Sequence, residues 1–534
     1  MERPLLVTDF LDRARRYYGE HEAVVATTGE RYTYDEFGDR VDRFAAFLQS
    51  RGIEKGDRVA VLDPNTHYHL EAAYGTMNLG AMHTPLNYRL TPDDFEYVLT
   101  DAEVDAVYAD HAFADRIEAV REEVPVETFV TNDADAVEGD WLDFEDAIDN
   151  EGAFERPEMA EDEVITINYT SGTTGDPKGV MRTHRCETLH AYLTALHQDI
   201  EDTDVYYWTL PMFHVNGWGH IYAVTGMGAK HVCARGVDVE RVFEAIREED
   251  VSYMCAAPTV LNQLQNYHDA HDVPTRGAND VRVATAGAAP PEATIRTVED
   301  EFGWHIMHVY GATETGPLIT TSDFGRFIDE ESRFRVKKRQ GIGFLGTEIR
   351  VVDEDGNDVP HDDSTIGEVV VRGNQVMDRY WNKPEETEEA FNDRIEGYYH
   401  MGDLATVDED GFIAIRDRKK DIIISGGENI SSIELEDTIF EHPDVADVAV
   451  IPSPSEEWGE TPKAFVVPES GDPEDPGVEP EEITGFTRER LASYKVVRRI
   501  EFVSELPTTA TGKVQKYELR EQEWADEEDM VGQG

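Results

Sequence analysis

The stretch YTSGTTGDPKGV, residues 169–180, follows a β-branched apolar run at residues 164–169, which predicts a loop at the end of a strand. Small hydroxyl side chains alternate with glycines in this loop: Thr170, Ser171, Gly172, Thr173, Thr174 and Gly175. Glycines let backbone N–H groups turn toward an anion, and Lys178 adds a positive charge. We therefore predict a phosphate-binding loop rather than an ordinary polar turn.

This loop differs from a Walker A loop, in which Gly-Lys-Ser/Thr opens a helix. Here Asp176 and Pro177 precede Lys178, and Gly179 follows it. A proline and a glycine on either side of the lysine disfavour a helix start at that point. The phosphate-binding loop is therefore expected to lie outside the Walker class.

The composition predicts a folded, acidic protein. A chain of 534 residues is too long for one hydrophobic core, so at least two domains are expected. The net charge is −64, from 112 acidic and 48 basic residues, yet 40% of the residues are hydrophobic, which excludes a disordered acidic chain. Because salt screens surface repulsion, we expect a protein of a halophilic cytoplasm. The same charge would repel nucleic acid and anionic membranes.

The cysteines and the apolar segments also predict a cytoplasmic protein. Cys186, Cys233 and Cys255 show no CxxC spacing and are expected to be buried thiols in a reducing compartment. No signal-peptide core follows Met1, and no stretch of 18 apolar residues occurs, so no membrane span is expected.

Residues 235–312 alternate strand and helix patterns with little interruption. The expected strands are residues 251–256, 281–286 and 305–309. Such alternation predicts a largely parallel sheet covered by helices on both faces. Because ligands of parallel sheets bind at the carboxyl ends of the strands, the loops at Thr170, Gly287 and Tyr310 are expected to converge on one site.

The pattern changes after about residue 342. Residues 347–352 and 367–372 predict paired antiparallel strands, an appendage on the large α/β domain. A charged, turn-rich segment ends at residues 417–421, and a short α+β pattern follows it. We therefore expect an N-terminal domain at residues 1–416, a boundary at 417–421 and a small C-terminal α+β domain at 422–534.

Eight motifs in one order resemble the adenylate-forming superfamily, which includes acyl-CoA synthetases, adenylation domains of peptide synthetases and luciferases. They are YTSGTTGDPKGV at 169, PMFHVNGW at 211, GAAP at 287, YGATETG at 310, GD at 402, DRKKD at 417, SGGENISSIELE at 425 and LPTTATGKVQK at 506. The motifs cover essentially the whole chain. The resemblance implies an AMP-forming acyl-CoA synthetase acting on a fatty acid.

The implied chemistry has two steps. A carboxylate is a poor electrophile, so its oxygen first attacks the α-phosphorus of ATP, giving an acyl-adenylate and pyrophosphate. The thiol of coenzyme A then displaces AMP. Two anions meet in the first step, so positive charge and Mg²⁺ are required. The expected partners are ATP, coenzyme A and a small carboxylic acid, with a homodimer as a further possibility because long-chain relatives include homodimers.

By resemblance, the loop from Thr170 to Lys178 holds the β- and γ-phosphates, and Thr170 and Glu314 lie near Mg²⁺. Thr313 would contact the α-phosphate. The residues expected around adenine are Gly287, Ala288, Ala289, Tyr310 and Gly311. Asp403 matches the ribose-binding aspartate, and Arg418 matches a second ribose or phosphate contact.

The resemblance also assigns a moving C-terminal domain. Lys513 matches the lysine that bridges the substrate carboxylate and the α-phosphate during adenylation. Lys420 matches the hinge residue about which the domain rotates between the two steps. Gly426 and Gly427 match the strip that lines the pantetheine tunnel in the second orientation.

The acid is less well defined by the sequence. His214 matches a position beside the reacting carboxylate, and Trp218 resembles the aromatic gate of long-chain fatty acyl-CoA synthetases, with packing in the core as its alternative. His400 and Met401 stand where the family has Arg-Thr, and the GGENISS form around Asn429 is more frequent in short- and medium-chain relatives. The alternatives are therefore an aryl-acid ligase, an enzyme that loads a carrier protein, and a non-catalytic relative lacking Lys513 or Glu314, both of which are present.

Overall fold

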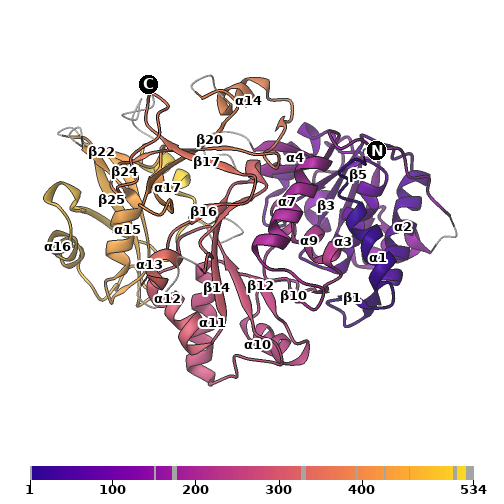
Figure 1. Ribbon diagram of the computed structural model, residues 1–534, viewed down its shortest axis with the longest axis horizontal. Helices are drawn as coiled ribbons and strands as arrows, with labels where there is room; N and C mark the ends of the chain where they lie inside the picture. The colour runs from indigo at the N-terminus through magenta and orange to yellow at the C-terminus, as the bar shows by residue number, and fades with distance from the viewer. Residues whose placement is uncertain are drawn as a thin grey trace. The chain divides into compact units, whose positions relative to one another are not determined.

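The computed structural model describes residues 3–149, 152–170, 177–325, 332–391, 395–425, 428–455, 458–508 and 514–524. Their contacts divide the chain into two compact units (Figure 1). The first comprises Met1–Glu348 and Val371–Tyr399, and the second comprises Ile349–Val370 and His400–Gly534. The expected antiparallel appendage therefore groups with the C-terminal segment. A hinge is identified by comparing two conformations of a chain, and this structure shows one. The hinge expected at residues 417–421 therefore stays a prediction.

One sheet of the first unit carries the phosphate-loop motif. Within the described ranges it has eight strands, in the order β19-β9-β8-β4-β3-β5-β6-β7. Their bounds are β3 (Arg58–Leu62), β4 (Met82–Pro85), β5 (Ala106–Ala109), β6 (Thr128–Thr131), β7 (Leu142–Asp143), β8 (Val164–Thr170), β9 (Lys178–Thr183) and β19 (Arg379–Tyr380). The strands from β8 to β7 are parallel, whereas β9 and β19 are antiparallel additions at one edge.

A second sheet carries the other two motif loops of this unit. Its described strands number nine, in the order β16-β15-β14-β13-β12-β10-β11-β1-β2. Their bounds are β1 (Glu22–Val25), β2 (Arg31–Thr33), β10 (Val205–Tyr207), β11 (Lys230–Val232), β12 (Tyr253–Cys255), β13 (Arg282–Thr285), β14 (His305–Gly311), β15 (Leu318–Thr321) and β16 (Ile342–Gly343). The strands from β14 to β1 are parallel. The expected strands at residues 251–256, 281–286 and 305–309 all belong to this sheet, as β12, β13 and β14.

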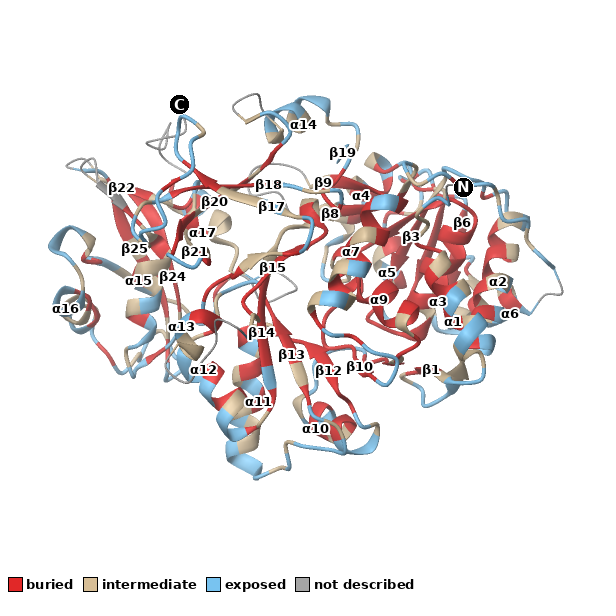
Figure 2. Ribbon diagram, in the orientation of Figure 1, coloured by how far each residue is buried: buried red, intermediate tan, exposed pale blue. Residues whose placement is uncertain are grey.

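Helices cover these sheets and fill the space between them. Their bounds are α1 (Asp9–Tyr18), α2 (Tyr34–Ser50), α3 (His67–Asn78), α4 (Pro92–Asp101), α5 (Ala114–Glu118), α6 (Phe144–Ile148), α7 (His184–His197), α8 (Val215–Trp218), α9 (His220–Met227), α10 (Val239–Glu248), α11 (Pro258–His271), α12 (Glu292–Arg296), α13 (Arg333–Lys337) and α14 (Pro384–Ala390). As Figure 2 shows, α3 and α9 are buried over nearly their whole length, whereas α11 has an exposed outer face. One core cluster draws on both sheets and on α2, α3, α7 and α9. Tyr74 of α3 and Tyr222 of α9 meet edge to face in it.

The second unit has two sheets of its own. The four described strands of one are β17 (Glu348–Val352), β18 (Gly367–Arg372), β20 (Tyr399–Val407) and β21 (Ile413–Arg418). The five described strands of the other are β22 (Ile423–Ser425), β23 (Glu428–Ile430), β24 (Val445–Ser455), β25 (Gly459–Pro468) and β26 (Arg499–Phe502). Three helices accompany them in the described part: α15 (Ser432–Phe440), α16 (Pro480–Arg490) and α17 (Lys516–Glu523). The predicted α+β character of the C-terminal segment is confirmed.

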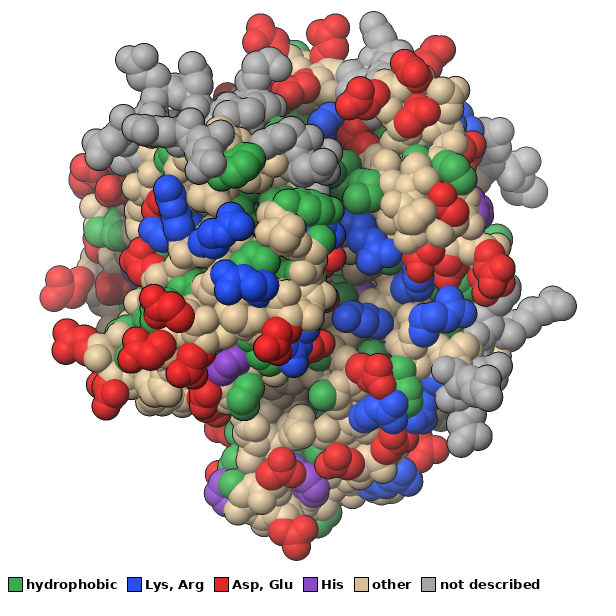
Figure 3. Space-filling view, turned by 90° about the vertical axis from the view of Figure 1, so that its left-hand side faces the viewer, with side chains coloured by type: hydrophobic (Ala, Val, Ile, Leu, Met, Phe, Trp, Pro, Cys, Tyr) green, Lys and Arg blue, Asp and Glu red, His purple; other side chains and the backbone are tan. Residues whose placement is uncertain are grey.

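The cysteines, the absence of a membrane span and the acidic surface were all expected from the sequence. All three cysteines lie among the described residues, where they are buried and form no disulfide. Among the described residues, no helix is long and apolar enough to cross a bilayer. On the face shown in Figure 3, acidic side chains are spread over the surface and mixed with lysine and arginine.

Candidate active site

The phosphate-loop motif forms a hairpin rather than a strand and helix. Strands β8 and β9 pair antiparallel, and Thr170 lies opposite Lys178 across the pair. The expectation that no helix follows Lys178 is confirmed, because β9 begins at that residue. The remaining members of the predicted loop lie outside the described residues: Ser171, Gly172, Thr173, Thr174 and Gly175. The same holds for Lys513, Gly426 and Gly427.

Both ends of this loop are held by the C-terminal half of α4. The Tyr97 hydroxyl donates to the Pro177 carbonyl at 3.2 Å, and the Tyr169 hydroxyl donates to Asp101 Oδ2 at 2.6 Å. The Trp381 indole donates to the Asp101 carbonyl at 2.7 Å. The mouth of the loop is therefore fixed to a neighbouring helix, which places Thr170 and Lys178 before any phosphate binds.

The Gly287 and Tyr310 loops lie on adjacent strands of the other sheet. Strands β13 and β14 are parallel, and Thr285 lies opposite His308. Strand β13 ends at Thr285, whereas β14 continues to Gly311 and pairs there with β15. Gly287 has a φ of 92° and open space where a Cβ would lie, so backbone conformation rather than crowding requires the glycine. Tyr310, Gly311 and Thr313 are half-buried at the same edge. The structure therefore brings the predicted adenine residues to one edge.

Tyr380 connects the phosphate hairpin with the Glu314 loop. Its hydroxyl donates to Glu314 Oε1 at 2.9 Å, and Lys178 Nζ lies 5.3 Å from the centre of its ring. The backbone is held as well, because Tyr380 pairs with Val180 and the Met377 amide donates to the Glu314 carbonyl at 2.6 Å. The loops that begin near Thr170 and Tyr310 were predicted to converge, and Tyr380, which the sequence did not single out, contacts Lys178 of one and Glu314 of the other.

The Tyr380 phenol remains a donor at neutral pH. Burial, followed by the charge of Glu314, raises the pKa of Tyr380 above its ordinary value. A protonated phenol beside a carboxylate donates a charge-assisted hydrogen bond, which fixes that carboxylate more firmly than a neutral bond would. Glu314 is therefore held in one orientation by Tyr380.

The donor set at Glu314 fits Mg²⁺. Among the described residues, no group of three or more His, Cys, Asp or Glu side chains is arranged to hold a metal ion. Glu314 instead supplies one carboxylate, and Thr170 supplies a hydroxyl in the hairpin. Mg²⁺ typically takes one or two carboxylates and completes its shell with water and substrate phosphates. Glu314 and Thr170 therefore fit an ion that arrives with ATP.

His214 and Trp218 lie at a left-handed turn. Five consecutive residues have positive φ: Val215 (48°), Asn216 (54°), Gly217 (57°), Trp218 (53°) and Gly219 (76°). The Trp218 amide donates to the His214 carbonyl at 3.2 Å, and the Gly219 amide donates to the Val215 carbonyl at 3.3 Å. Non-glycine residues pay roughly 1–2 kcal/mol each in this conformation, so surrounding contacts must hold the turn.

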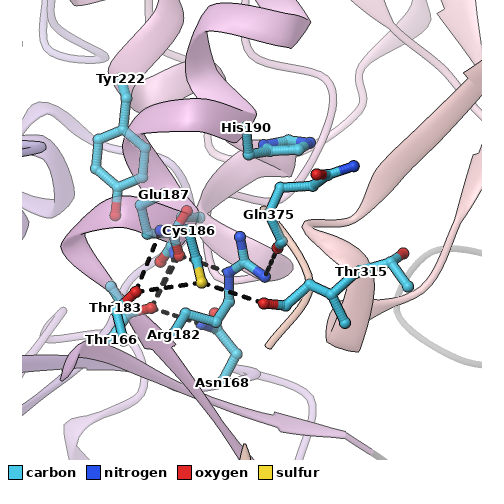
Figure 4. A network of polar contacts seen from close by, with 12 residues as sticks. Thr166, Asn168, Arg182, Thr183, Cys186, Glu187, His190, Tyr222, Thr315 and Gln375 are labelled. Carbon is cyan, nitrogen blue, oxygen red and sulfur yellow. Dashed lines mark hydrogen bonds and ion pairs between the residues drawn. The ribbon is translucent and has the colours of Figure 1, made fainter. Parts of the chain in front are cut away.

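A buried ion pair lies beside that turn (Figure 4). Arg182 Nε of β9 donates to Glu187 Oε1 of α7 at 2.8 Å, and neither side chain is exposed. The same carboxylate oxygen accepts from Thr166 Oγ1 at 2.9 Å and from Asn216 Nδ2 at 2.8 Å. Arg182 Nη1 also donates to the Gln375 carbonyl at 3.1 Å. The pair therefore joins the hairpin, the left-handed turn and the segment that leads to Tyr380.

The predicted ribose residues meet within the second unit. Asp403 on β20 lies opposite Arg418 on β21, and Arg418 Nε lies 3.2 Å from Asp403 Oδ1. Lys420 is exposed in the turn after β21. His400 Nδ1 lies 3.4 Å from Glu368 Oε1, so the residue that replaces the family's arginine still faces a carboxylate.

A model of the family described as "AMP-binding enzyme" matches residues 10–381, and one described as "AMP-binding enzyme C-terminal domain" matches residues 434–513. The chain belongs to the AMP-binding enzyme family. The resemblance to the adenylate-forming superfamily is thus confirmed, and so is the expected fold.

Curated relatives match this AMP-binding enzyme over nearly all of its length. A 4-hydroxybutyrate–CoA ligase of Metallosphaera sedula is 37% identical, over 97% of this chain and 94% of that protein. A 2-methylpropanoate–CoA ligase of Humulus lupulus is 36% identical, over 97% of this chain and 95% of that protein. The crystal structure of an anthranilate CoA ligase in complex with anthranoyl-AMP aligns with a TM-score of 0.85 at 26% identity, covering 98% of each chain.

These similarities confirm the predicted enzyme class. The protein is an ATP-dependent acyl-CoA ligase that activates a carboxylic acid as its adenylate and transfers the acyl group to coenzyme A. Three contributors to the site were missed in the sequence: Tyr380, Arg182 and Glu187. The residue types alone do not indicate a role in the site. Tyr380, Arg182 and Glu187 belong to none of the eight motifs, and isolated arginines and glutamates are usually found on protein surfaces.

Proposed function

We propose that this AMP-binding enzyme converts a short-chain aliphatic acid to its CoA thioester. The observation that carries the substrate class is Trp218, which is only 6% exposed and packs in the core cluster with Trp208, Met212 and Leu318. It follows His214 by four residues, at the position that the resemblance places near the reacting carboxylate. A fixed indole so close to the carboxylate restricts the length of the acyl chain.

The curated relatives support a short acid. Two of the relatives at 36–37% identity are named for 4-hydroxybutyrate and 2-methylpropanoate, which are both four-carbon acids. A trans-cinnamate:CoA ligase of Petunia hybrida, at 33% identity, and the anthranilate ligase, at 26% identity, are named for acids that carry an aromatic ring. An aryl acid is therefore the second candidate, and the identities favour the aliphatic one.

In the first step, the acid carboxylate attacks the α-phosphorus of ATP, and the bond to the pyrophosphate oxygen breaks. Lys178 and the hydroxyl-rich hairpin bind the β- and γ-phosphates, while Thr313 approaches the α-phosphate. Mg²⁺, when bound, neutralises phosphate charge in this step. Glu314 and Thr170 would hold that ion, and Tyr380 keeps the Glu314 carboxylate oriented toward it.

Lys513 is proposed to bridge the carboxylate and the α-phosphate during this step. In the second step, the CoA sulfur attacks the acyl carbon, the bond to the AMP oxygen breaks, and the thiol proton passes to solvent. Rotation about Lys420 would bring Gly426 and Gly427 to the pantetheine path, while Asp403 and Arg418 hold the ribose. Loading of a carrier protein is the alternative outcome of the second step.

The setting of the reaction is part of the proposal. The buried, unpaired thiols and the −64 net charge support a reducing, salt-rich cytoplasm. A homodimer is the assembly that the resemblance suggests, and sedimentation at several protein concentrations would test it.

A panel of acids tests the proposed substrate. Pyrophosphate release would be measured in molar KCl with linear acids of two to sixteen carbons, branched and hydroxylated four-carbon acids, and benzoates. We expect the largest kcat/KM with four-carbon acids, and we expect Trp218→Ala to shift the optimum to longer chains. A preference for benzoates, or an unchanged profile in Trp218→Ala, would contradict the assignment. The acceptor is identified by the thioester formed: acyl-CoA formation supports coenzyme A, whereas formation of a thioester only on a carrier protein supports the alternative.

A further inference from the structure

Asn216, a buried side chain of the left-handed turn Val215–Gly219, ties this turn to α7. Its Nδ2 donates to Glu187 Oε1 at 2.8 Å, and both side chains are completely buried. Val215 is β-branched and Trp218 is bulky, and both residue types disfavour positive φ. A backbone conformation of this kind persists only when its surroundings determine it. The Asn216–Glu187 hydrogen bond is one such contact, and His220 Nδ1, which lies 2.8 Å from the Gly217 carbonyl, is another.

Glu187 can serve as an anchor because it is itself fixed. It accepts from Thr166 Oγ1 at 2.9 Å and pairs with Arg182, which is buried to the same extent (Figure 4). Arg182 in turn donates to the Gln375 carbonyl, so the ion pair also positions the segment that reaches Tyr380. The turn and this segment thus share one buried anchor.

The other side of the turn rests on His190. A Cβ at Gly219 would lie 2.6 Å from the His190 ring, and so would a Cβ at Gly316. The His190 Nε2 accepts from the Leu318 amide at 3.2 Å. The turn and the end of the Glu314 loop therefore pack on one buried ring, which places the turn beside the site where the acid is activated.

We propose that Asn216 is a positioning residue that sets acid selectivity. Its tether keeps the turn left-handed and so holds Trp218 where it restricts the acyl chain. The proposal rests on the proposed acid activation and adds the residue that maintains the restriction. Loss of Asn216 releases the turn alone, whereas loss of Arg182 releases the turn and the Gln375 segment together.

The test is Asn216→Gly. Glycine adopts positive φ without strain, so this variant removes the tether and leaves the backbone free to keep its conformation. We expect the KM for a four-carbon acid to rise about tenfold and the kcat/KM ratio of eight- to four-carbon acids to rise about tenfold, the size of effect that small changes in an apolar pocket produce. The KM for ATP should stay at its wild-type value.

Two further variants serve as comparisons. Asn382→Gly makes the same substitution at an exposed residue with a φ of 51°. It should leave kcat and the KM for the acid and for ATP unchanged. The double variant Arg182→Met with Glu187→Met keeps the site filled, avoids a lone buried charge and removes the oxygen that accepts from Asn216. It should raise the KM of both the acid and ATP. A higher kcat/KM ratio of eight- to four-carbon acids in this variant tests the tether even if Asn216→Gly does not fold.

An acid profile in Asn216→Gly that matches the wild type would overturn the proposal. The proposal would also be overturned if the KM for ATP rose by the same factor as the KM for the acid, since Asn216 would then act on the whole site. A wild type that is inactive with every acid in the panel would instead overturn the proposed function.

Discussion

At the scale of single residues, Tyr380 explains how two distant motifs act together. Its ring faces the Lys178 ammonium and its hydroxyl binds Glu314, so one side chain sets the spacing between the proposed phosphate ligand and the proposed metal ligand. Neither contact involves a residue near it in the sequence. Tyr380 is therefore a positioning residue for the nucleotide rather than a group that reacts.

Tyr380→Phe separates these two contacts, because the ring stays over Lys178 while the bond to Glu314 is lost. A hydrogen bond to a charged group contributes about 1.5–3 kcal/mol, so we expect the affinity for ATP in the presence of Mg²⁺ to fall about tenfold or more. Calorimetric titration with ATP, without any acid, measures this directly. Affinity without Mg²⁺ should be unaffected.

Tyr97→Phe is the matched comparison for that experiment. It also removes one phenol, but that phenol donates to the Pro177 carbonyl at the mouth of the loop. We expect it to weaken ATP binding equally with and without Mg²⁺. If Tyr380→Phe showed the same pattern, Tyr380 would support the loop rather than the metal ligand.

The residues of the site were predictable only in part. Thr170, Lys178, Gly287, Tyr310 and Glu314 belong to motifs whose types already suggest phosphate, adenine or metal binding. Arg182 and Glu187 are five residues apart in the sequence, but their partners Asn216 and Gln375 are not near them. Such a network depends on the tertiary fold, and a single sequence carries no record of it.

At the scale of elements, the packing of α9 against β11 depends on a neutral histidine. Trp208 Nε1 donates to His231 Nδ1 at 3.2 Å, and Thr225 Oγ1 lies 3.0 Å from Nε2. Burial lowers the pKa of His231 to about 3. Protonation at Nδ1 would remove the acceptor that Trp208 uses.

His231 should make stability depend on pH. The unfolded chain binds a proton below pH 6.5, whereas the folded His231 stays neutral, so stability is complete above pH 6.5 and falls as the pH drops toward 3. We expect His231→Gln to reduce the slope of unfolding free energy against pH by about 1.4 kcal/mol per pH unit between pH 6.5 and 5. Urea unfolding in molar KCl measures that slope.

His271→Gln, at an exposed histidine that ends α11, is the control for this measurement. It should keep the wild-type slope. A slope in His231→Gln that equals the wild-type slope would mean that His231 does not carry the predicted proton linkage.

Regular elements were easier to predict than the turn that shapes the acid site. Strands β8, β12, β13 and β14 lie where β-branched and apolar runs indicate them, because burial on both faces requires such residues. The left-handed turn after His214 has no comparable signal. Its residues prefer other conformations, and buried contacts from α7 and β9 decide the outcome.

At the scale of the whole molecule, the sequence indicated parallel sheets but not how many. Strands from both halves of the first unit show the same alternation with helices, and only pairing partners separate them into two sheets. The separation matters for function, since the phosphate hairpin and the Glu314 loop come from different sheets. The motifs led us to expect that these two loops meet, whereas hydrophobic periodicity carries no information about contacts between sheets.

The acidic surface should make stability depend on salt. With a net charge of −64, repulsion acts over about 10 Å at 0.1 M salt and over about 3 Å at 1 M. We expect the midpoint of thermal unfolding to rise between 0.1 and 2 M KCl by clearly more than in sorbitol of equal osmolality, which stabilises without screening charge. Equal rises in the two solutes would contradict a role for charge repulsion.

The central claim is that the acid is activated as an adenylate before coenzyme A takes part. Acid-dependent exchange of labelled pyrophosphate into ATP, without coenzyme A, tests it most directly, with wild type and Lys513→Ala compared. We predict exchange that requires the acid, ATP and Mg²⁺, falls by about 10²-fold or more in Lys513→Ala, and leaves that variant able to form thioester from supplied acyl-adenylate. Exchange that requires coenzyme A, or an equal loss of both half-reactions in Lys513→Ala, would contradict it.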